Sequence, residues 1–507
     1  MCGIIAIYGD NASHWVQCLE TGLDVLSHRG PDDQGTYVGS NIVLGQTRLS
    51  IIDVAGGRQP IFAEDGQKCV ICNGEIYNYL FLKDGLSQHR FRTDSDTEVL
   101  LHLFEDEGVE SVSRLDGMFA FVLYDGKDIL VARDPLGIKP LYQGQREGCL
   151  FFASELKALD GMVDNIQEFP PGHYYSSERG LVQYYHLPEV IDWNDNVVEI
   201  SKLLREKLNS AVQKRWMSDV PLGCFLSGGI DSSLISAISK QNFDHLDTFS
   251  VGLGKDAPDF MYAREVAQFL GTTHHEYAYT ADDVLEALPS VIHHLESFDP
   301  ALVRSAIPCY FVSRLAKDYV KVILTGEGSD EVFAGYHYFK QFSSKEDVHK
   351  EAVRILTGLH NMNLQRVDRA TMAHSIEGRV PFLDIDFVEY AVSIDPGLKL
   401  AGKRRRRIEK WLLRQAFTNY LPGRIIWRPK MEFAAGCGSE QLMTELLEDK
   451  ISDAEFEQEK KEIQNVQISS KEELYYFKIF QSFFNSDGAI EAIGRWQGGF
   501  ATEGSDL

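Results

Sequence analysis

A cysteine at position 2 gives the chain a candidate N-terminal nucleophile. Cys2 follows Met1 directly, so removal of Met1 would leave this cysteine with a free α-amine. An α-amine has a pKa of about 7.7–8.0, and its neutral fraction can act as a base near neutral pH. One residue would then supply both a thiol nucleophile and the base that activates it. Position 2 taken alone also fits a small residue in a first strand, so the prediction depends on the segments described below.

A glycine-rich loop in the middle of the chain indicates phosphate binding. The segment Leu226–Ser233 reads Leu-Ser-Gly-Gly-Ile-Asp-Ser-Ser and lies between an apolar run and a helical pattern. Glycines let the backbone approach a ligand closely, and the start of a helix offers unpaired N–H groups and a favourable dipole. No Walker-type G-x-x-x-x-G-K-[ST] sequence occurs, because each Gly-Lys pair is followed by Asp or Arg. The loop therefore predicts a phosphate site unlike that of the P-loop ATPases.

A second polar segment, Thr325–Glu331, follows another apolar run. It places Glu327, Asp330 and Glu331 within six positions, Gly326–Glu331. Three acids at the end of one buried strand favour a functional role over that of solvated loop residues.

The elements that must hold these residues change in type along the chain. Up to about residue 185, short runs rich in Ile, Val, Phe and Tyr alternate with Gly and Asp, which is typical of strands. Two segments carry helical spacing instead. The predicted strands are Gly3–Tyr8, Ile42–Ile52, Cys69–Asn73, Ala120–Tyr124 and Ile129–Arg133, and the predicted helices are Trp15–Ser27 and Thr97–Glu105. This pattern predicts an α+β domain, followed by a polar linker at about 176–198.

From about residue 200, predicted strands and helices alternate, as expected for a parallel sheet covered by helices. The predicted strands are 222–226, 248–252, 275–279 and 321–325, and the predicted helices are 232–240, 261–270, 285–297 and 306–317. Ligands in this architecture bind at the carboxyl ends of the strands. Beyond Phe333 the pattern is mostly helical, and residues 440–462 are expected to form a solvated acidic helical face.

The composition is that of a globular protein with a sizeable core. The 507 residues are 44% hydrophobic and 25% charged, with a formal net charge of −25. Such a chain has no global positive field for nucleic acid, no run of 18 apolar residues for a membrane and no signal-peptide pattern. Its eight cysteines are too sparse for a disulfide scaffold. We therefore expect a cytoplasmic protein with reduced thiols and small-molecule substrates.

Four further segments in the first hundred residues carry a family resemblance. In chain order they are 28–32 (His-Arg-Gly-Pro-Asp), 48–53 (Arg-Leu-Ser-Ile-Ile-Asp), 73–78 (Asn-Gly-Glu-Ile-Tyr-Asn) and 95–98 (Ser-Asp-Thr-Glu). With Cys2, they resemble the class II, or N-terminal-nucleophile (Ntn), glutamine amidotransferases. The Leu226–Ser233 loop, Thr325–Glu331 and the segment 373–384 extend the resemblance to the family of glutamine-dependent asparagine synthetases.

The resemblance implies a glutamine site in the N-terminal part. Cys2 would attack the glutamine carboxamide, which gives a glutamyl thioester and ammonia. The Asn73 side chain and the Gly74 N–H would form the oxyanion hole, and Arg48 would pair with the α-carboxylate. Glu75 and Asp96 would receive the α-ammonium, although Asp96 also fits a helix N-cap.

The resemblance also implies an ATP site in the C-terminal part. Asp231 and Asp330 would hold Mg²⁺ on the pyrophosphate, Glu327 would act as the general base for ammonia, and Lys430 would neutralise charge on the phosphoryl group. The residues expected to bind ATP are Leu226, Ser227, Gly228, Gly229, Asp231, Ser232, Val251, Thr325 and Gly326.

Together these features imply two domains and one overall reaction. Residues 1–190 are expected to form an α+β glutaminase of the Ntn type, and residues 200–507 an α/β synthetase domain with a parallel sheet of the ATP-pyrophosphatase type. Aspartate, glutamine, ATP and water would give asparagine, glutamate, AMP and pyrophosphate through β-aspartyl-AMP. The oligomeric state stays open, with a homodimer as one option. Two alternatives also stay open: a different carboxylate acceptor, and a glutaminase-containing binding module with a decayed synthetase half.

Overall fold

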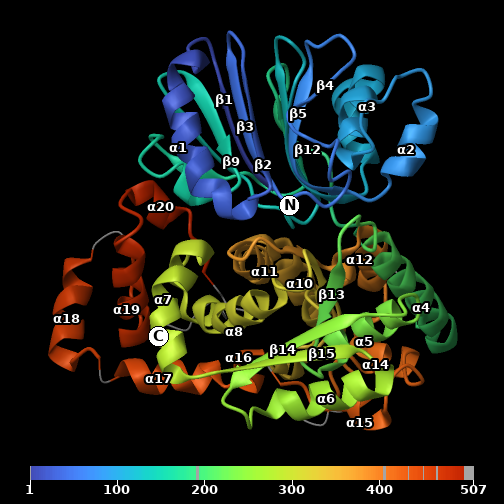
Figure 1. Ribbon diagram of the computed structural model, residues 1–507. Helices are drawn as coiled ribbons and strands as arrows, with labels where there is room; N and C mark the ends of the chain where they lie inside the picture. The colour runs from blue at the N-terminus through green and yellow to red at the C-terminus, as the bar shows by residue number, and fades with distance from the viewer. Residues whose placement is uncertain are drawn as a thin grey trace.

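The computed structural model describes residues 2–189, 193, 195–402, 407–431, 433–448, 450–463 and 466–495. Figure 1 shows two halves stacked on one another: the N-terminal half carries two facing sheets, and the C-terminal half carries one sheet surrounded by helices. The halves touch through buried side chains, because Arg29 of the first half donates to both carboxylate oxygens of Asp368 in the second, at 2.8 and 3.0 Å.

Two six-stranded antiparallel sheets form the N-terminal half. The first has the order β10 (Ile166–Glu168), β8 (Tyr142–Arg146), β9 (Cys149–Ala153), β1 (Cys2–Tyr8), β3 (Ile42–Arg48), β2 (Asp33–Val38). The second has the order β12 (Gly180–Gln183), β11 (His173–Ser176), β7 (Ile129–Arg133), β6 (Gly117–Tyr124), β5 (Cys69–Ile76), β4 (Ile61–Phe62).

Each of these sheets packs on the other and on an outer helix. Side chains alternate between the two faces of a strand, so β1 packs Ile4 and Ala6 against the second sheet and Ile5 and Ile7 against α1 (Val16–Leu26). The helix α3 (Val99–Glu107) covers the second sheet from outside. Because both faces of β1 are buried, its sequence is a continuous apolar run. The layer order helix–sheet–sheet–helix confirms the α+β prediction.

One five-stranded parallel sheet organises the C-terminal half. Its order is β15 (Thr273–Tyr279), β14 (Asp247–Leu253), β13 (Leu222–Phe225), β16 (Val322–Leu324), β17 (Glu377–Arg379). On one face β13 and β16 pack with α5 (Ile230–Lys240) and α6 (Pro258–Leu270), and on the other β14 packs with α7 (Ala281–Leu295) and α8 (Pro300–Ala316). Helices on both faces confirm the predicted α/β architecture.

The predicted linker at 176–198 is wrong in its first part. Gly180–Gln183 forms β12 and pairs with β11, from Ser176↔Gly180 to His173↔Gln183. Gly180 has φ +70°, a left-handed conformation that glycine adopts easily at a hairpin turn. β12 is a short edge strand of the second sheet, with the sequence Gly-Leu-Val-Gln. The polar residues that suggested a linker, Ser177–Arg179, form the turn before it. Residues 190–192 and 194 lie outside the described residues, and the next helix, α4, is Val197–Lys214.

The expectation that residues 440–462 are a solvated face is only partly correct. The helix α18 (Asp453–Glu462) has no buried residue. In α17 (Ser439–Glu448), however, Met443 and Leu447 are buried in one cluster with α8 and with Phe477 of α19 (Lys471–Gln481). Apolar residues four positions apart share one face of a helix, so α17 is amphipathic despite its acidic composition. Figure 1 shows α17 and α19 beside α7 and α8.

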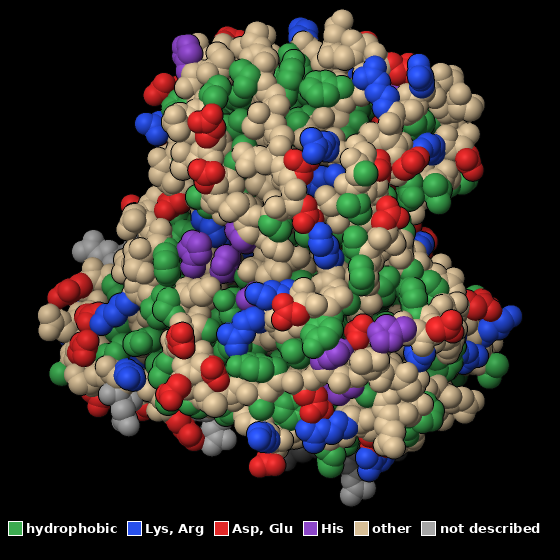
Figure 2. Space-filling view, in the orientation of Figure 1, with side chains coloured by type: hydrophobic (Ala, Val, Ile, Leu, Met, Phe, Trp, Pro, Cys, Tyr) green, Lys and Arg blue, Asp and Glu red, His purple; other side chains and the backbone are tan. Residues whose placement is uncertain are grey.

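The visible face of the molecule agrees with the prediction, made from the net charge, that the protein has no extended positive surface. Figure 2 shows blue Lys and Arg side chains interspersed with red Asp and Glu, and no continuous positive patch on that face. Within the described residues, no helix is both long enough and apolar enough to cross a bilayer.

Candidate active sites in the two halves

Cys2 lies where the two sheets of the N-terminal half meet. It opens β1, with Arg48 as its Cα partner on β3. Its backbone N–H donates to Oδ1 of Asn73 at 3.1 Å, and Asn73 belongs to β5 of the other sheet. Burial raises the pKa of the Cys2 thiol, and the nearby charge of Arg48 opposes this rise. Met1, whose removal the predicted nucleophile requires, lies outside the described residues.

The side chain of Asn73 offers an unused donor beside Cys2. Its Oδ1 accepts from Cys2, whereas its Nδ2 is buried and has no hydrogen-bond partner among the described residues. An unpaired buried donor is costly unless a ligand satisfies it. A preset donor close to the nucleophile is what an oxyanion hole requires, so the geometry supports the role predicted for Asn73.

Gly74 occupies a position in β5 that only glycine fits. Its φ is +149°, and a Cβ atom there would lie 2.0 Å from the carbonyl oxygen of Met118 and 2.7 Å from Cα of Phe119. Both neighbours are backbone atoms of β6 and cannot rotate away. Glycine therefore allows the close approach of β5 and β6 next to Asn73, while the role of the Gly74 N–H stays a prediction.

Arg48 is held by the loop that follows its own strand. Its Nη2 donates to the carbonyl oxygens of Ile52 and Asp53 at 3.1 and 2.8 Å, and its Nη1 donates to that of Val54 at 3.3 Å. A Cβ atom on Gly57 would come within 2.6 Å of Nη2, so glycine leaves the space for this guanidinium. These carbonyl oxygens fix the planar group and leave its positive charge without a carboxylate partner among the described residues, as the predicted binding of a substrate carboxylate needs.

Glu75 and Asp96 form a buried acidic pair at the same place. Oδ2 of Asp96 accepts from the N–H of Ile76 at 2.7 Å, which ties the 3₁₀ turn η3 (Asp96–Glu98) to β5. Burial raises the pKa of Asp96 to about 6 and that of Glu75 well above its usual value. Oε2 of Glu75 has no hydrogen-bond partner among the described residues. Two buried carboxylates, one of which has an oxygen without a hydrogen-bond partner among the described residues, fit the predicted ammonium site.

The alternative role of Asp96 as a helix N-cap is wrong. Ser95 is the cap, because its side chain accepts from the N–H of Thr97 at 3.2 Å. The Asp96 carboxylate instead accepts a hydrogen bond from the N–H of Ile76 on β5, so it caps no helix.

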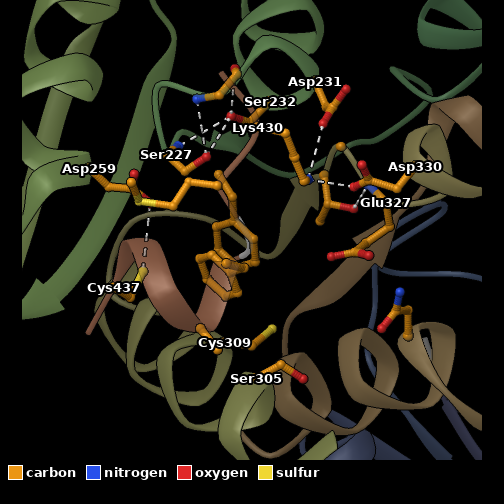
Figure 3. A pocket seen from close by; sticks show the side chains of 18 of the residues that line it. Ser227, Asp231, Ser232, Asp259, Ser305, Cys309, Glu327, Asp330, Lys430 and Cys437 are labelled. Carbon is orange, nitrogen blue, oxygen red and sulfur yellow. Dashed lines mark hydrogen bonds and ion pairs between the residues drawn. The ribbon is translucent and has the colours of Figure 1, made fainter. Parts of the chain in front are cut away.

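In the C-terminal half, a cavity of about 320 Å³ opens at the carboxyl ends of β13, β14 and β16. Figure 3 shows side chains from these strand ends and from the segment around Lys430 pointing into it. The predicted residues that line it are Leu226, Ser227, Gly229, Asp231, Ser232, Val251, Thr325, Gly326, Glu327, Asp330 and Lys430. The structure therefore brings together residues from positions 226 to 430 that only the family resemblance connected.

Gly228 is the predicted ATP residue that does not line this cavity. It has φ +71°, and a Cβ atom there would lie 2.4 Å from Cβ of Tyr262 on α6. Gly228 therefore shapes the loop by packing closely on α6. Beside it, the Ser227 N–H donates to Oγ of Ser232 at 3.2 Å, which closes the loop over the start of α5.

Four charged groups lie at the mouth of the loop. Nζ of Lys430 is 2.6 Å from Oδ2 of Asp330, and Nζ of Lys410 is 2.6 Å from Oδ2 of Asp231 and 2.7 Å from Oδ1 of Asp330. Burial would raise the pKa of Asp330, but the two ammonium groups outweigh it and hold that pKa below its usual value. Asp330 is therefore ionised, and both carboxylates are paired with ammonium groups of the protein.

Glu327 lines the same cavity and pairs with Arg366 of α11 (Asn363–Met372). Its backbone N–H donates to Oγ1 of Thr325 at 3.4 Å, which keeps the residue in the turn after β16. A carboxylate placed in this way can accept a proton from a nucleophile in the cavity, so its position supports the predicted general base.

Comparison with known proteins accounts for both halves. Residues 1–169 match the family described as a glutamine amidotransferase domain, and residues 203–347 and 340–497 match the family described as asparagine synthase. The chain is 40% identical over 516 residues to asparagine synthetase [glutamine-hydrolyzing] 2 of Arabidopsis thaliana, which covers 97% of this chain and 89% of that protein. A probable asparagine synthetase [glutamine-hydrolyzing] of Schizosaccharomyces pombe is 40% identical and covers 98% and 96%.

The chain belongs to the glutamine-hydrolysing asparagine synthetase family. This confirms the resemblance and the fold class, an Ntn-type amidotransferase half joined to an α/β synthetase half.

The residues present also fit the metal that this family resemblance implies. Asp231 lies in the first turn of α5, and Asp330 lies in the first turn of α9 (Ser329–Val332), so the two carboxylates come from the starts of two helices. Both are close enough to share one cation, since Lys410 contacts both. Two carboxylates beside a phosphate site are the oxygen donors that Mg²⁺ prefers.

Several site residues of this synthetase family member escaped sequence reasoning. Arg379 of β17 reaches across to the acidic pair of the N-terminal half, where its Nη2 lies 3.5 Å from Oε1 of Glu75. Arg29 donates from Nε to the carbonyl oxygen of Cys2 at 3.0 Å and also holds Asp368. Arg29 and Arg379 stand in the quoted motifs 28–32 and 373–384, which was the available signal. Lys410 carried no signal, because a single lysine in a helical stretch has no pattern.

Proposed function

We propose that this chain makes asparagine from aspartate, with glutamine as the nitrogen source and ATP as the energy source. The observation that carries the proposal is the presence of two complete constellations in one chain. One is a buried N-terminal thiol beside an unpaired amide donor, and the other is a glycine-rich loop facing two carboxylates and two lysines. Neither alone would explain the matched families, and together they perform the two half-reactions.

In the first half-reaction, the α-amine of Cys2, once Met1 is removed, takes the thiol proton. The sulfur attacks the carboxamide carbon of glutamine, and Asn73 Nδ2 donates to the oxygen that becomes negative. The tetrahedral adduct expels ammonia, which carries away the proton, and leaves a glutamyl thioester. Water then hydrolyses the thioester to glutamate and restores the thiol. Arg48, Glu75 and Asp96 hold the two charged groups of glutamine at its Cα.

In the second half-reaction, the β-carboxylate of aspartate attacks the α-phosphorus of ATP and expels pyrophosphate. Ammonia attacks the acyl carbon of β-aspartyl-AMP, Glu327 accepts a proton, and AMP leaves. Lys430 offsets charge on the phosphoryl oxygens. Asp231 and Asp330 would hold Mg²⁺, which when bound offsets the negative charge of the pyrophosphate.

Ammonia has to pass between the sites inside the protein, because bulk water at pH 7 would protonate it. Contacts across the halves support such coupling. Arg379 faces Glu75 of the glutamine site, and its carbonyl oxygen accepts from the N–H of Thr325, which lines the cavity of the C-terminal half, at 2.9 Å. One residue therefore touches both sites. We place the division between the two halves within 190–200, as the composition suggested.

The test is one incubation with ATP, Mg²⁺, aspartate and glutamine, in which AMP, pyrophosphate and asparagine are measured together. We expect asparagine, AMP and pyrophosphate in equal amounts. Glutamate without asparagine or pyrophosphate would contradict the synthetase assignment, and other carboxylates would then be screened as acceptors.

A further inference from the structure

Lys410 lies between the two carboxylates that are expected to hold the metal. Its Nζ is 2.6 Å from Oδ2 of Asp231 and 2.7 Å from Oδ1 of Asp330. Its side chain is completely buried, whereas Lys430, which approaches Asp330 from the other side at 2.6 Å, lines the cavity. Two ammonium groups thus face two carboxylates, and the group as a whole is neutral.

The position of Lys410 is fixed by the fold around it. Lys410 has φ +53° and precedes α14 (Trp411–Ala416), so the backbone turns sharply at this residue. A Cβ atom on Gly335 would lie 2.3 Å from Cε of Lys410 and 2.0 Å from Oδ1 of Asp330. Glycine at 335 is therefore what leaves room for the contact between Lys410 and Asp330.

This arrangement opposes the binding of a free divalent cation. Mg²⁺ requires its oxygen ligands at about 2.0–2.1 Å, and the ammonium group of Lys410 occupies the space between the same two oxygens. The four charged side chains together are neutral, so they do not attract a dication as a group. The dication would also lie close to two positive charges. Free Mg²⁺ can bind only if Lys410 leaves, and without a new anionic partner the buried ammonium has nowhere favourable to go.

A nucleotide removes this obstacle. The phosphates of ATP bring new negative charge to the loop Ser227–Ser232, directly beside the lysines, and ammonium groups are common phosphate partners. We propose that Lys410 keeps free Mg²⁺ out of the Asp231–Asp330 pair, so that the ion enters only with a nucleotide whose phosphates take over the lysine. The inference rests on the proposed role of this pair in metal–nucleotide binding.

The experiment uses Mn²⁺ as a probe, since it takes the same oxygen ligands as Mg²⁺ and its free form has an electron paramagnetic resonance signal. Full-length protein is titrated with Mn²⁺ in two arms, one without nucleotide and one with ATP. Aspartate is left out of both arms, so that no turnover occurs. For the wild type we expect protein-dependent loss of the free-ion signal with ATP only. Equal binding with and without ATP would overturn the proposal, and this arm needs no variant.

The variant Lys410→Met sharpens the result. It retains most of the side-chain volume and leaves the ammonium of Lys430 facing both carboxylates, so the group of three carries a net charge of −1. Mn²⁺ alone should therefore bind at least about tenfold more tightly than to the wild type. Mg²⁺ alone should also raise its melting temperature. The control is Lys345→Met, which opens the Lys345–Asp395 pair in the same half but leaves a single carboxylate. The control should bind Mn²⁺ no more tightly than the wild type, and Mg²⁺ should not raise its melting temperature. No gain for Lys410→Met, measured on folded protein, would also overturn the proposal.

The two failures can be told apart. Asparagine formation together with tight Mn²⁺ binding to the nucleotide-free wild type would refute the gating role of Lys410 and leave the enzyme assignment intact. ATP-dependent Mn²⁺ binding without asparagine formation would refute the proposed function and leave the gating role intact.

Discussion

The two active sites treat buried carboxylates in opposite ways. In the glutamine site, burial raises the pKa values of Glu75 and Asp96, even with the Arg379 guanidinium 3.5 Å from Glu75. In the nucleotide site, Asp330 is also buried, yet Lys410 and Lys430 hold its pKa below the usual value. The acidic pair of the first site has one guanidinium within 4 Å among the described residues, whereas the pair of the second site faces two ammonium groups.

This difference matches the charges that the substrates carry. In the proposed glutamine site, Glu75 and Asp96 would attract the α-ammonium of glutamine, and Arg48 would pair with its α-carboxylate. ATP brings several negative charges. The lysines that already face Asp231 and Asp330 can turn to its phosphates, so the protein needs no further cation in the cavity. Each half is thus complementary to the charge its own substrate adds. The predictions below test whether the two sites can be disabled or titrated separately.

The largest effect is expected from Cys2→Ala. Removal of the nucleophile should lower glutamine-dependent asparagine formation more than about a thousandfold. Synthesis from an ammonium salt should be retained, because the nucleotide site makes no use of the thiol. Initial rates with the two nitrogen sources, measured side by side, check this.

The matched control for this variant is Cys18→Ala. Cys18 is also a free cysteine, but it lies on the outer helix α1 and is only partly buried. It should leave both rates unchanged. Retention of glutamine use by Cys2→Ala would show that the thiol is not the nucleophile.

The second effect mirrors the first. Glu327→Ala should lower asparagine formation about a hundredfold or more with either nitrogen source, because the proton acceptor for ammonia is lost. Hydrolysis of glutamine to glutamate should persist, since Glu327 belongs to the other half. Unimpaired synthesis in this variant would remove Glu327 from the mechanism.

The elements of the fold could largely be predicted from sequence where local patterns are strong. The glycine-rich loop, the alternation of β13 to β16 with helices, and the strand that carries Cys2 all follow from runs of apolar residues and turn residues. The ends of the strands are predicted less accurately than their presence. The predicted strand Ile42–Ile52 ends at Arg48, because β1 offers partners only from Tyr8 to Cys2.

The parts that could not be predicted depend on contacts between distant residues. Lys410 and Asp231 are 179 positions apart, and Arg29 and Asp368 are 339 positions apart. A single charged residue has no periodicity, so its partner emerges only from the packed fold. The strand β12 has too few residues for an alternating pattern to show, and the polar turn before it has the composition of a linker.

A smaller effect is expected from Gly74→Ala. The new Cβ would lie 2.0 Å from the Met118 oxygen, so β5 must move away from β6 and carry Asn73 with it. We expect kcat/KM for glutamine hydrolysis to fall about tenfold to a hundredfold, with ammonia-dependent synthesis unchanged. The control is Gly66→Ala, which also has positive φ, +70°, but no neighbour within 4 Å. It should cost stability without loss of glutaminase. Equal glutaminase rates for both variants would contradict the steric argument.

The smallest expected effect is a change in the slope of log kcat/KM for glutamine against pH. It distinguishes the two sites without a mutation. Below a pH of about 7.7, protonation of the Cys2 α-amine should lower log kcat/KM for glutamine by one per pH unit. Burial raises the pKa of Asp96 to about 6, so below that pH this acid takes up a proton and loses the charge that faces the substrate ammonium. The slope should therefore steepen from one to two or more, because the pKa of Glu75 in the same pair is also raised. Asp96→Asn, which never carries that charge, should show a shallower slope than the wild type in this range. Aspartate-dependent exchange of pyrophosphate into ATP, which uses no ammonia, should show no such step, because the lysines keep Asp330 ionised at this pH. A slope of one for the wild type down to pH 5 would mean that Asp96 does not bind the ammonium group.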